Sequence, residues 1–435
     1  MFGRLRDIFK IPDLRNRILF TLALLAVYRL GGHIPLPGVD TKALLSFFAG
    51  ARGTILGLYD IFVGGNLANG TIFGLGIMPY ISASIILQLL GAAVPYFQRL
   101  MKEGEEGRRK ITQYTRYLTV AISTLQGFGI AVMLENLRTP TGVVVVNPGL
   151  RFKFLTVLTL VAGTIFIMWL GELITERGIG NGISLIIMVG IVARFPNYFI
   201  RTLQMVRVGL SPVAVFMVLV TFFLLTLALV WVTQAQRRIP VQYAQRVVGR
   251  RIYGGRSTHI PLTMNTAGVI PIIFAQSALM LPATMARFFS ANPIAQEVVN
   301  IFNPQSWIYN LFYTGLIVFF AYFYTAIVIN PQDLADNLKR YGGFIPGVRP
   351  GEKTAQYIDH ILTRITLPGA LFFAFAAIAP TYVTAKLNVP FYFGGTSLII
   401  VVGVALDTLR QIEAHLVMRH YEGFLHRGRI RGRRG

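Results

Sequence analysis

The sequence contains no cysteine, and this absence removes several kinds of chemistry at once. Without cysteine the chain forms no disulfide, carries no thiol nucleophile and offers no thiolate ligand to a metal ion. Acidic residues are also few, 18 Asp and Glu against 41 Lys and Arg, which gives a formal net charge of +23. Charged residues of both signs make up only 14% of the 435 residues, which excludes an ordinary water-soluble globule.

Long apolar runs take the place of the missing charge. Apolar residues make up 54% of the chain, and its mean hydropathy is +0.58. The sequence therefore predicts an all-α membrane protein that crosses the bilayer several times. Residues 1–17 are basic and amphipathic and lack a small-residue cleavage motif, so the first run is expected to be a permanent helix rather than a signal peptide. Ten candidate spans lie at residues 18–34, 71–94, 117–134, 154–174, 182–200, 212–233, 265–283, 306–329, 365–384 and 394–409.

The placement of lysine and arginine predicts the orientation of these spans. If the N-terminus is cytoplasmic, the cytoplasmic segments hold 30 of the 41 basic residues. An even number of spans then leaves both ends of the chain in the cytoplasm. This bias also accounts for the net charge without any nucleic-acid partner.

Ionisable side chains are scarce near the centres of the predicted spans. Arg29, Glu135, Glu172 and Asp407 all lie towards span ends, whereas a proton or ion pathway normally keeps a charge deeper in the membrane. The histidines stand alone and have no metal-ligand spacing, and no P-loop motif occurs. We therefore expect no catalytic residue, cofactor or metal site, and no enzymatic activity. The six histidines are His33, His259, His360, His415, His420 and His426.

The stretch TIFGLGIMPYISASIILQLL at residues 71–90 is predicted to be a membrane helix with a second task. It carries glycine, proline and polar side chains that a helix facing only lipid does not need. The preceding GLYDIFVGGNLANG is too short to span, and this pairing indicates a pore with a segment folded into its mouth. A secondary transporter with broken helices is the alternative, although an uncharged centre offers a solute little to bind.

Two loops are larger than a turn requires. Residues 234–264 alternate apolar and polar side chains around VVGRRIYGG, which predicts a β-hairpin with a basic tip. Residues 331–364 contain the helix-like DLADNLKRY. Within the spans, Ile77 and Ile81 are four residues apart, as are Ile183 and Ile187, so each pair shares one helix face. Ordinary packing explains such pairs equally well.

Four stretches resemble the SecY family of protein-conducting channels. TIFGLGIMPYISASIILQLL and WLGELITERGIGNGISLII resemble its two signature stretches, and FIPGVRPGEKTAQYI and VPFYFGGTSLIIVV resemble its later landmarks. The resemblance extends from Val27 to the tenth span. It implies ten transmembrane helices in two inverted five-helix halves around a central pore, which translocates unfolded preproteins and releases membrane helices sideways.

The resemblance also assigns residues to the parts of such a channel. Six branched apolar side chains are expected to form a dry ring at the pore constriction. A plug at residues 55–70 closes the pore from the outer side, and three polar residues line a lateral gate that a signal sequence opens. The pore ring is Ile77, Ile81, Ile183, Ile187, Ile273 and Ile400; the plug centres on Leu58, Tyr59, Asp60, Ile61, Phe62, Val63, Gly64 and Gly65; the gate is Ser82, Gln126 and Asn265.

Partners and domain bounds follow from the same resemblance. Arg250, Arg251 and Arg349 correspond to positions that dock the SecA ATPase and the ribosome, through its RNA and proteins, while SecE and SecG are the expected small subunits. Preprotein signal sequences and membrane lipid are the other partners, and the bacterial inner membrane is the expected location. The expected parts are a cytoplasmic N-terminus (1–17), an N-terminal half (18–202), a hinge connection (203–211), a C-terminal half (212–412) and a basic cytoplasmic tail (413–435).

Overall fold

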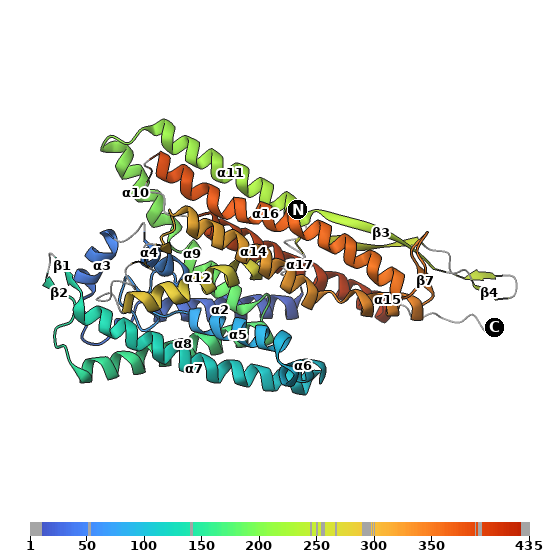
Figure 1. Cartoon of the computed structure of the whole chain (residues 1–435), viewed down its shortest axis with the longest axis horizontal. Helices are drawn as coiled ribbons and strands as arrows, with labels where there is room; N and C mark the ends of the chain where they lie inside the picture. Colours follow the sequence, from blue (N-terminus) through green and yellow to red (C-terminus); the bar gives the residue numbers. More distant parts are fainter. Residues whose placement is uncertain are drawn as a thin grey trace. The chain divides into compact units, whose positions relative to one another are not determined.

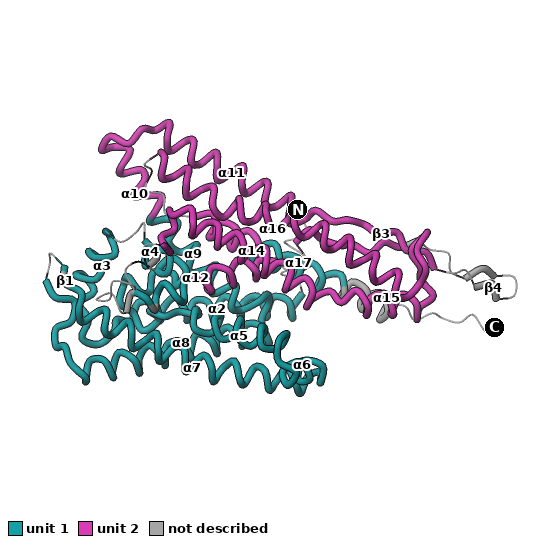
Figure 2. The backbone as a smooth tube through the Cα atoms, viewed as in Figure 1, with its two compact units in different colours: residues 1–197, 280–299, 404–435 teal, residues 198–279, 300–403 magenta. Residues whose placement is uncertain are grey.

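The structure is a computed structural model in which long helices make up most of the chain (Figure 1). It describes residues 11–50, 54–139, 142–243, 246–248, 251–253, 257–265, 268–288, 297, 299, 301–387, 389 and 394–427. The chain divides into two compact units, coloured separately in Figure 2. Unit 1 comprises residues 1–197, 280–299 and 404–435, and unit 2 comprises residues 198–279 and 300–403. The domain bounds expected from the sequence stay a prediction.

Unit 1 is a bundle of packed helices with a short buried helix, α4, against α9. Antiparallel helices α7 and α8 form its longest pair, and α5 packs on α7. Its elements are α2 (Pro12–Gly31), α3 (Thr41–Gly50), α4 (Ile55–Phe62), α5 (Met78–Ala93), α6 (Pro95–Lys102), α7 (Glu105–Asn136), β1 (Arg138–Thr139), β2 (Gly142–Val143), α8 (Leu150–Arg177) and α9 (Gly182–Val192), with the later parts of α12 and α17.

The sequence predicted that the stretch at residues 71–90 is helical from its first residue, and this prediction is wrong. Thr71 forms an isolated β-bridge with Pro35, residues 72–77 form turns, and α5 begins only at Met78. Gly76 has a φ of +56°, a conformation that ends helical geometry and that glycine adopts most easily. Pro79 lies in the first turn of α5, where its missing N–H breaks no helical hydrogen bond. The glycines and proline thus delay the helix start instead of kinking a continuous span.

Helix α8 approaches the turn before α5 so closely that only glycine fits at residue 163. A Cβ atom on Gly163 would clash with the backbone carbonyl oxygen of Ile72, which has no side-chain freedom to move away. At Gly127 on α7, by contrast, an added Cβ would meet its nearest atom, the Cα of Val157, at 3.7 Å, an ordinary contact. Gly163 is therefore required by the close backbone contact, whereas the structure leaves room for a side chain at Gly127.

We expect Gly163→Ala to destabilise the folded protein and Gly127→Ala to leave it unchanged or slightly more stable. Both substitutions gain the helix propensity of alanine, about 0.5–1 kcal/mol, but only the first forces backbone apart, at about 1–3 kcal/mol. The midpoint of thermal unfolding in mild detergent measures the difference. Equal midpoints for the two variants would contradict this account of the α8 contact.

Unit 2 combines apolar helices with a small antiparallel sheet. The sheet has the strand order β6-β3-β7, and β4 and β5 form a separate hairpin beyond it. The elements are α10 (Phe195–Arg207), which begins in unit 1, α11 (Pro212–Gln234), β3 (Gln236–Tyr243), β4 (Arg246–Val248), β5 (Arg251–Tyr253), β6 (Ser257–Thr263), α12 (Ile270–Phe288), α14 (Trp307–Val328), α15 (Pro331–Arg340), β7 (Gly343–Phe344), α16 (Glu352–Lys386) and α17 (Gly395–Arg427).

The two long loops of unit 2, residues 234–264 and 331–364, fold together into one compact body, the loop body. The hairpin predicted at residues 234–264 is confirmed, since β3 pairs with β6 along its length. Strand β3 also pairs with β7 from the second loop, where Gln242 faces Phe344 and Tyr243 faces Gly343. The predicted helix of the second loop is α15. An apolar core stabilises this body, and two of its residues, Ile358 and Leu362, come from the first turns of α16. The core consists of Ile239, Val241, Leu262, Leu338, Ile345, Ile358 and Leu362.

Length and composition alone identify fewer spans than the ten that the sequence predicted. Among the described residues seven helices qualify, or eight if α5 and α6, bent by 99° at Val94, count as one. The predicted first span lies in α2, where Asp13, Arg15 and Arg17 leave a short apolar part. The predicted seventh span lies in α12, whose apolar part covers only Ile270–Thr284. The fifth span, predicted at 182–200, has a short break between α9 and α10 but is one of the seven that qualify, as Gly182–Arg207.

Candidate functional site

The segment predicted to be a plug forms helix α4 and the turn after it, and it is buried in unit 1. Tyr59, Ile61, Phe62 and Val63 are each 5% exposed or less, and Leu58 is half-buried. The apolar sequence ILGLYDIF explains the burial, because nearly every side chain of this short helix gains from leaving water. Helix α4 packs on α9.

An ion pair joins this buried segment to the end of α9. Oδ2 of Asp60 lies 2.6 Å from Nη2 of Arg194, which follows α9 by two residues. The other carboxylate oxygen, Oδ1, accepts a hydrogen bond of 2.8 Å from the backbone N–H of Ala68. Burial raises the pKa of the Asp60 carboxyl above its ordinary value, and the Arg194 guanidinium and the backbone amides of Ala68 and Leu67 oppose that shift. The contacts therefore offset part of the free energy needed to bury the charge.

Glycine residues allow the backbone of this segment to touch α9 directly. Gly64 has a φ of +72°, and a Cβ atom there would lie 2.7 Å from the Cα of Gly190. A Cβ on the next residue, Gly65, would clash with the Arg194 guanidinium. The turn is thus shaped to fit between the glycine of α9 and the arginine side chain beyond it.

A second set of hydrogen bonds holds the turn against α2. Nδ2 of Asn66 donates to the carbonyl oxygen of Val63 at 2.8 Å and lies 3.3 Å from the Tyr28 hydroxyl. The Tyr28 hydroxyl in turn donates to the Val63 carbonyl at 3.4 Å. The Tyr59 hydroxyl donates to the carbonyl of Leu75 at 3.2 Å, in the turns that precede α5. Three elements of unit 1 therefore hold the segment: α2, α9 and the lead into α5.

The six isoleucines predicted to line a pore divide between the two units. Ile77 is the residue before α5 and Ile81 lies in its first turn, while Ile183 and Ile187 lie on α9, all in unit 1. Five of the six are buried, and Ile183 is half-buried. Ile273 on α12 and Ile400 on α17 belong to unit 2. Within unit 1, α9 thus carries two of these isoleucines and also contacts the α4 segment.

The polar residues predicted at a lateral gate likewise come from both units. In unit 1, Ser82 on α5 and Gln126 on α7 are buried on two helices that pack together. Gln126 borders a small cavity of about 20 Å³, and its Oε1 accepts no hydrogen bond from the described residues. Asn265 of unit 2 lies beside a separate small cavity of about 20 Å³. The cavity of unit 1 is lined by Leu56, Tyr59, Leu67, Leu75, Gln126, Ile130, Met133 and Thr284, so it joins a gate residue to the α4 segment.

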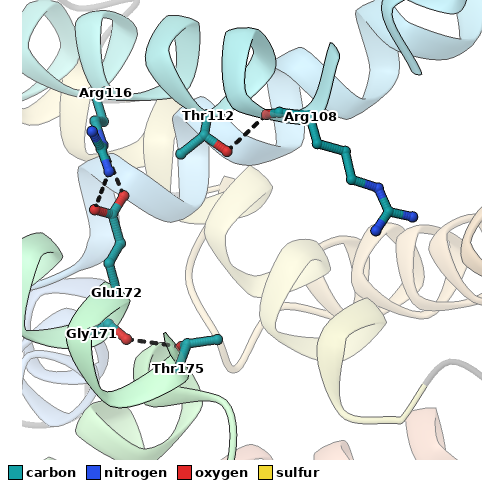
Figure 3. A network of polar contacts seen from close by, with 6 residues as sticks. All are labelled: Arg108, Thr112, Arg116, Gly171, Glu172 and Thr175. Atoms are coloured by element: carbon teal, nitrogen blue, oxygen red, sulfur yellow. Dashed lines mark hydrogen bonds and ion pairs between the residues drawn. The ribbon is translucent and has the colours of Figure 1, made fainter. Parts of the chain in front are cut away.

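Ion pairs fasten α7 to α8 at both ends of the pair. Arg116 donates from Nε and Nη2 to the two carboxylate oxygens of Glu172, at 3.0 and 2.6 Å (Figure 3). At the opposite end, Glu135 accepts from the Lys153 ammonium at 3.0 Å and from the backbone N–H of Gly149 at 2.7 Å. In Figure 3 the Arg108 side chain points away from the Arg116 pair. Ion pairs at both ends hold α7 and α8 together, and this helix pair supports α5, which packs on α7.

The three arginines predicted to dock partners lie in the loops of unit 2. Arg349 is exposed shortly before α16, and its carbonyl accepts a hydrogen bond of 2.9 Å from the Thr354 hydroxyl. Arg251 opens strand β5, and only its backbone is described. Arg250 lies outside the described residues.

Comparison with known proteins identifies the family. A profile of the SecY family matches residues 71–409. The protein translocase subunit SecY of Aquifex aeolicus (strain VF5) is 49% identical over 426 residues, covering 97% of this chain and 99% of the relative. The subunit of the same name from Escherichia coli (strain K12) is 47% identical over 97% of this chain and 96% of the relative. The chain belongs to the SecY family.

Solved structures agree with this assignment at the level of the fold. A structure described as "The structure of a protein conducting channel" has a TM-score of 0.68 at 17% identity, covering 92% of each chain. A second, described as "The plug domain of the SecY protein stablizes the closed state of the translocation channel and maintains a membrane seal", has a TM-score of 0.67 at 18% identity over 92% of each chain. A third, "Sec61 in the Canine ribosome-channel complex from the endoplasmic reticulum", has a TM-score of 0.64 at 16% identity over 92% of each chain.

Membership of the SecY family confirms the main expectations from the sequence. The protein is a multi-pass, helical membrane protein and a protein-conducting channel. Its ten-helix architecture in two halves is consistent with the SecY and Sec61 folds. The solute-transporter alternative has no support, since none of these relatives is a transporter of small solutes.

The residues that hold the α4 segment in place were not predicted from the sequence. Arg194, Tyr28 and Asn66 were not singled out, although the sequence carried a signal for the first. Asp60 is the one charged residue between positions 55 and 70, and Arg194 is the one charged residue between 178 and 200. Because a lone charge in an apolar stretch needs a partner, the two residues could have been matched.

Proposed function

We propose that this channel is sealed at rest by the six isoleucines and by the α4 segment acting as a plug. Branched apolar side chains around a constriction exclude water and ions without forming hydrogen bonds that a moving polypeptide would have to break. Unfolded chains of any sequence then pass through the same ring. A segment of α4's size, lodged beside the ring, blocks the residual opening.

The contact between α4 and α9 is the observation that carries this proposal. Helix α9 bears Ile183 and Ile187, and the same helix, through Gly190, touches the turn after α4. A plug must lie next to the ring that it covers, and this packing supports such a position. Ion pairs and hydrogen bonds, rather than covalent links, hold the segment there, so it can leave when a polypeptide enters.

We further propose that Ser82, Gln126 and Asn265 line a lateral gate. Hydrogen bonds between helices in a membrane contribute about 0.6 kcal/mol each, so a seam of a few small polar residues closes reversibly. Oε1 of Gln126 accepts no hydrogen bond within the described part of the chain, and this favours an opening motion, because a new donor reaching it would lower the free energy of the open seam. A signal sequence or nascent membrane helix is the expected occupant.

The partners of this chain are proposed on the same basis. We propose SecE and SecG as its small subunits, and the SecA ATPase and the ribosome as partners that dock on the loops carrying Arg250, Arg251 and Arg349. The exposure of Arg349 supports docking, and the Sec61 neighbour was observed in a ribosome-channel complex. The proposed location is the bacterial inner membrane with both termini in the cytoplasm, as the distribution of basic residues favours.

The absence of cysteine makes the proposed ring directly testable. We expect a single cysteine placed at Ile81, Ile187 or Ile273 to cross-link to a cysteine in a polypeptide stalled during translocation in reconstituted vesicles. Ile167→Cys is the control, because Ile167 is fully buried on α8 of unit 1 and is not among the six. Cross-links at the control position that match those at the ring positions would contradict the proposed path.

A further inference from the structure

The strongest unexplained feature of unit 1 is a charged pair inside an apolar region. The Asp60 side chain is 5% exposed and that of Arg194 is 21% exposed, and their charged atoms approach to 2.6 Å. Isolated ions of this kind are costly to bury, and removing one partner leaves an uncompensated charge. Apolar packing alone would hold α4 in place without this expense, so the pair calls for a separate explanation.

The geometry ties the pair to movement of the α4 segment. Asp60 belongs to α4, whereas Arg194 follows α9, so the bond joins the proposed moving part to the wall. The same carboxylate holds Ala68, eight residues further on, which couples the turn to the helix. Gly65 lies against the guanidinium and Gly64 against Gly190, so the turn packs directly on Arg194 and on the end of α9.

We infer that Arg194 is a positioning residue, a latch that keeps the plug seated by pairing with Asp60 and covering Gly65. The inference rests on the proposed plug. The latch is strong while the pair is dry and short, and it weakens sharply once water reaches either ion, because the attraction falls with the rising dielectric constant. It therefore favours two discrete states, seated and released, over gradual loosening.

Thiol labelling of Val63→Cys tests the latch on the full chain, since this would be the sole cysteine. Val63 is 1% exposed, so a membrane-impermeant maleimide labels it only when the segment leaves its seat. We expect Arg194→Gln to raise the labelling rate about 100-fold, because it strands the Asp60 carboxylate. Arg177→Gln, which removes an exposed charge from the end of α8, is the matched control and should leave the rate unchanged.

The double variant Asp60→Asn with Arg194→Gln distinguishes a latch from general damage. Neutralising both partners removes the stranded charge, so we expect labelling of Val63→Cys to fall back by at least about tenfold from that of Arg194→Gln alone. If the effects of Asp60→Asn and Arg194→Gln on the labelling rate simply multiply in the double variant, the two residues act independently and the latch is overturned. So would a parallel rise in labelling of Ile167→Cys on α8, since that would mean that Arg194→Gln unfolds the bundle.

Ion conductance through resting channels separates the latch from the plug itself. Deleting residues 58–65 should open a leak if the plug proposal holds, and Arg194→Gln should open a smaller, flickering one. A leaking deletion with a tight Arg194→Gln channel refutes the latch and leaves the plug standing. A deletion that does not leak refutes the plug and the latch together.

Discussion

Ile273→Asn is expected to let preproteins with defective signal sequences cross the membrane at least about tenfold faster than the unmodified channel does. Ile273 is 4% exposed, and an amide at this position would have no partner in the proposed dry ring of aliphatic side chains. An unsatisfied buried polar group costs about 1–3 kcal/mol, and this penalty disappears once the ring opens and takes up water. The substitution thus destabilises the closed state relative to the open one. Export in reconstituted vesicles, with a matched pair of substrates carrying intact and defective signals, measures the effect.

A buried isoleucine outside the proposed ring provides the control. Ile317 on α14 of unit 2 is 1% exposed, and Ile317→Asn introduces the same amide at equal depth. We expect it to lower the thermal stability without admitting defective signals. If both variants admit these substrates alike, general loosening rather than a ring would account for the phenotype.

Reversing Arg250, Arg251 and Arg349 to Glu together is expected to weaken partner docking by at least about 1,000-fold while leaving membrane insertion intact. Each charge-assisted hydrogen bond to phosphate or carboxylate contributes about 1.5–3 kcal/mol, and three are lost at once. The fold should persist, because Arg349 is exposed and the core of the loop body is entirely aliphatic. Binding of SecA and of ribosomes to vesicles, measured at several salt concentrations, reports the loss.

The same loop body offers a charge-matched comparison. Lys339, Arg340 and Lys353 also lie there, and reversing all three changes the net charge equally. If docking depends on particular arginines, this second triple should retain most of the affinity. An equal loss from both triples would assign the effect to bulk charge, and undiminished docking by the first triple would remove these arginines from the interface.

The sequence predicted the helical membrane architecture well because apolar runs and basic loops are local signals. The hairpin at residues 234–264 was also predictable, since its alternation of side chains needs only neighbouring residues. The start of α5 was predicted wrongly: an apolar stretch hides the left-handed turn at Gly76, whose necessity comes from contact with Val63.

Features that depend on distant contacts could not be predicted in the same way. The pairing of β3 with β7 joins loops about a hundred residues apart, and the short β7 has no strand signature of its own. The pairing of Arg194 with Asp60 is also long-range, but the sequence carries a partial signal for it, because each is the one charged residue of an apolar stretch. For β7, the partner strand is identified only when the chain is folded.

Helix α16 connects the loop body rigidly to the helices of unit 2. This helix runs unbroken for 35 residues, about 52 Å at the usual rise, and its first turns are built into the aliphatic core beneath the sheet. A force that displaces the sheet is therefore transmitted along the rigid α16 helix, which a flexible linker would not do. Pro368 and Pro380 each remove one hydrogen bond from the helix, so any bending is concentrated at these two points.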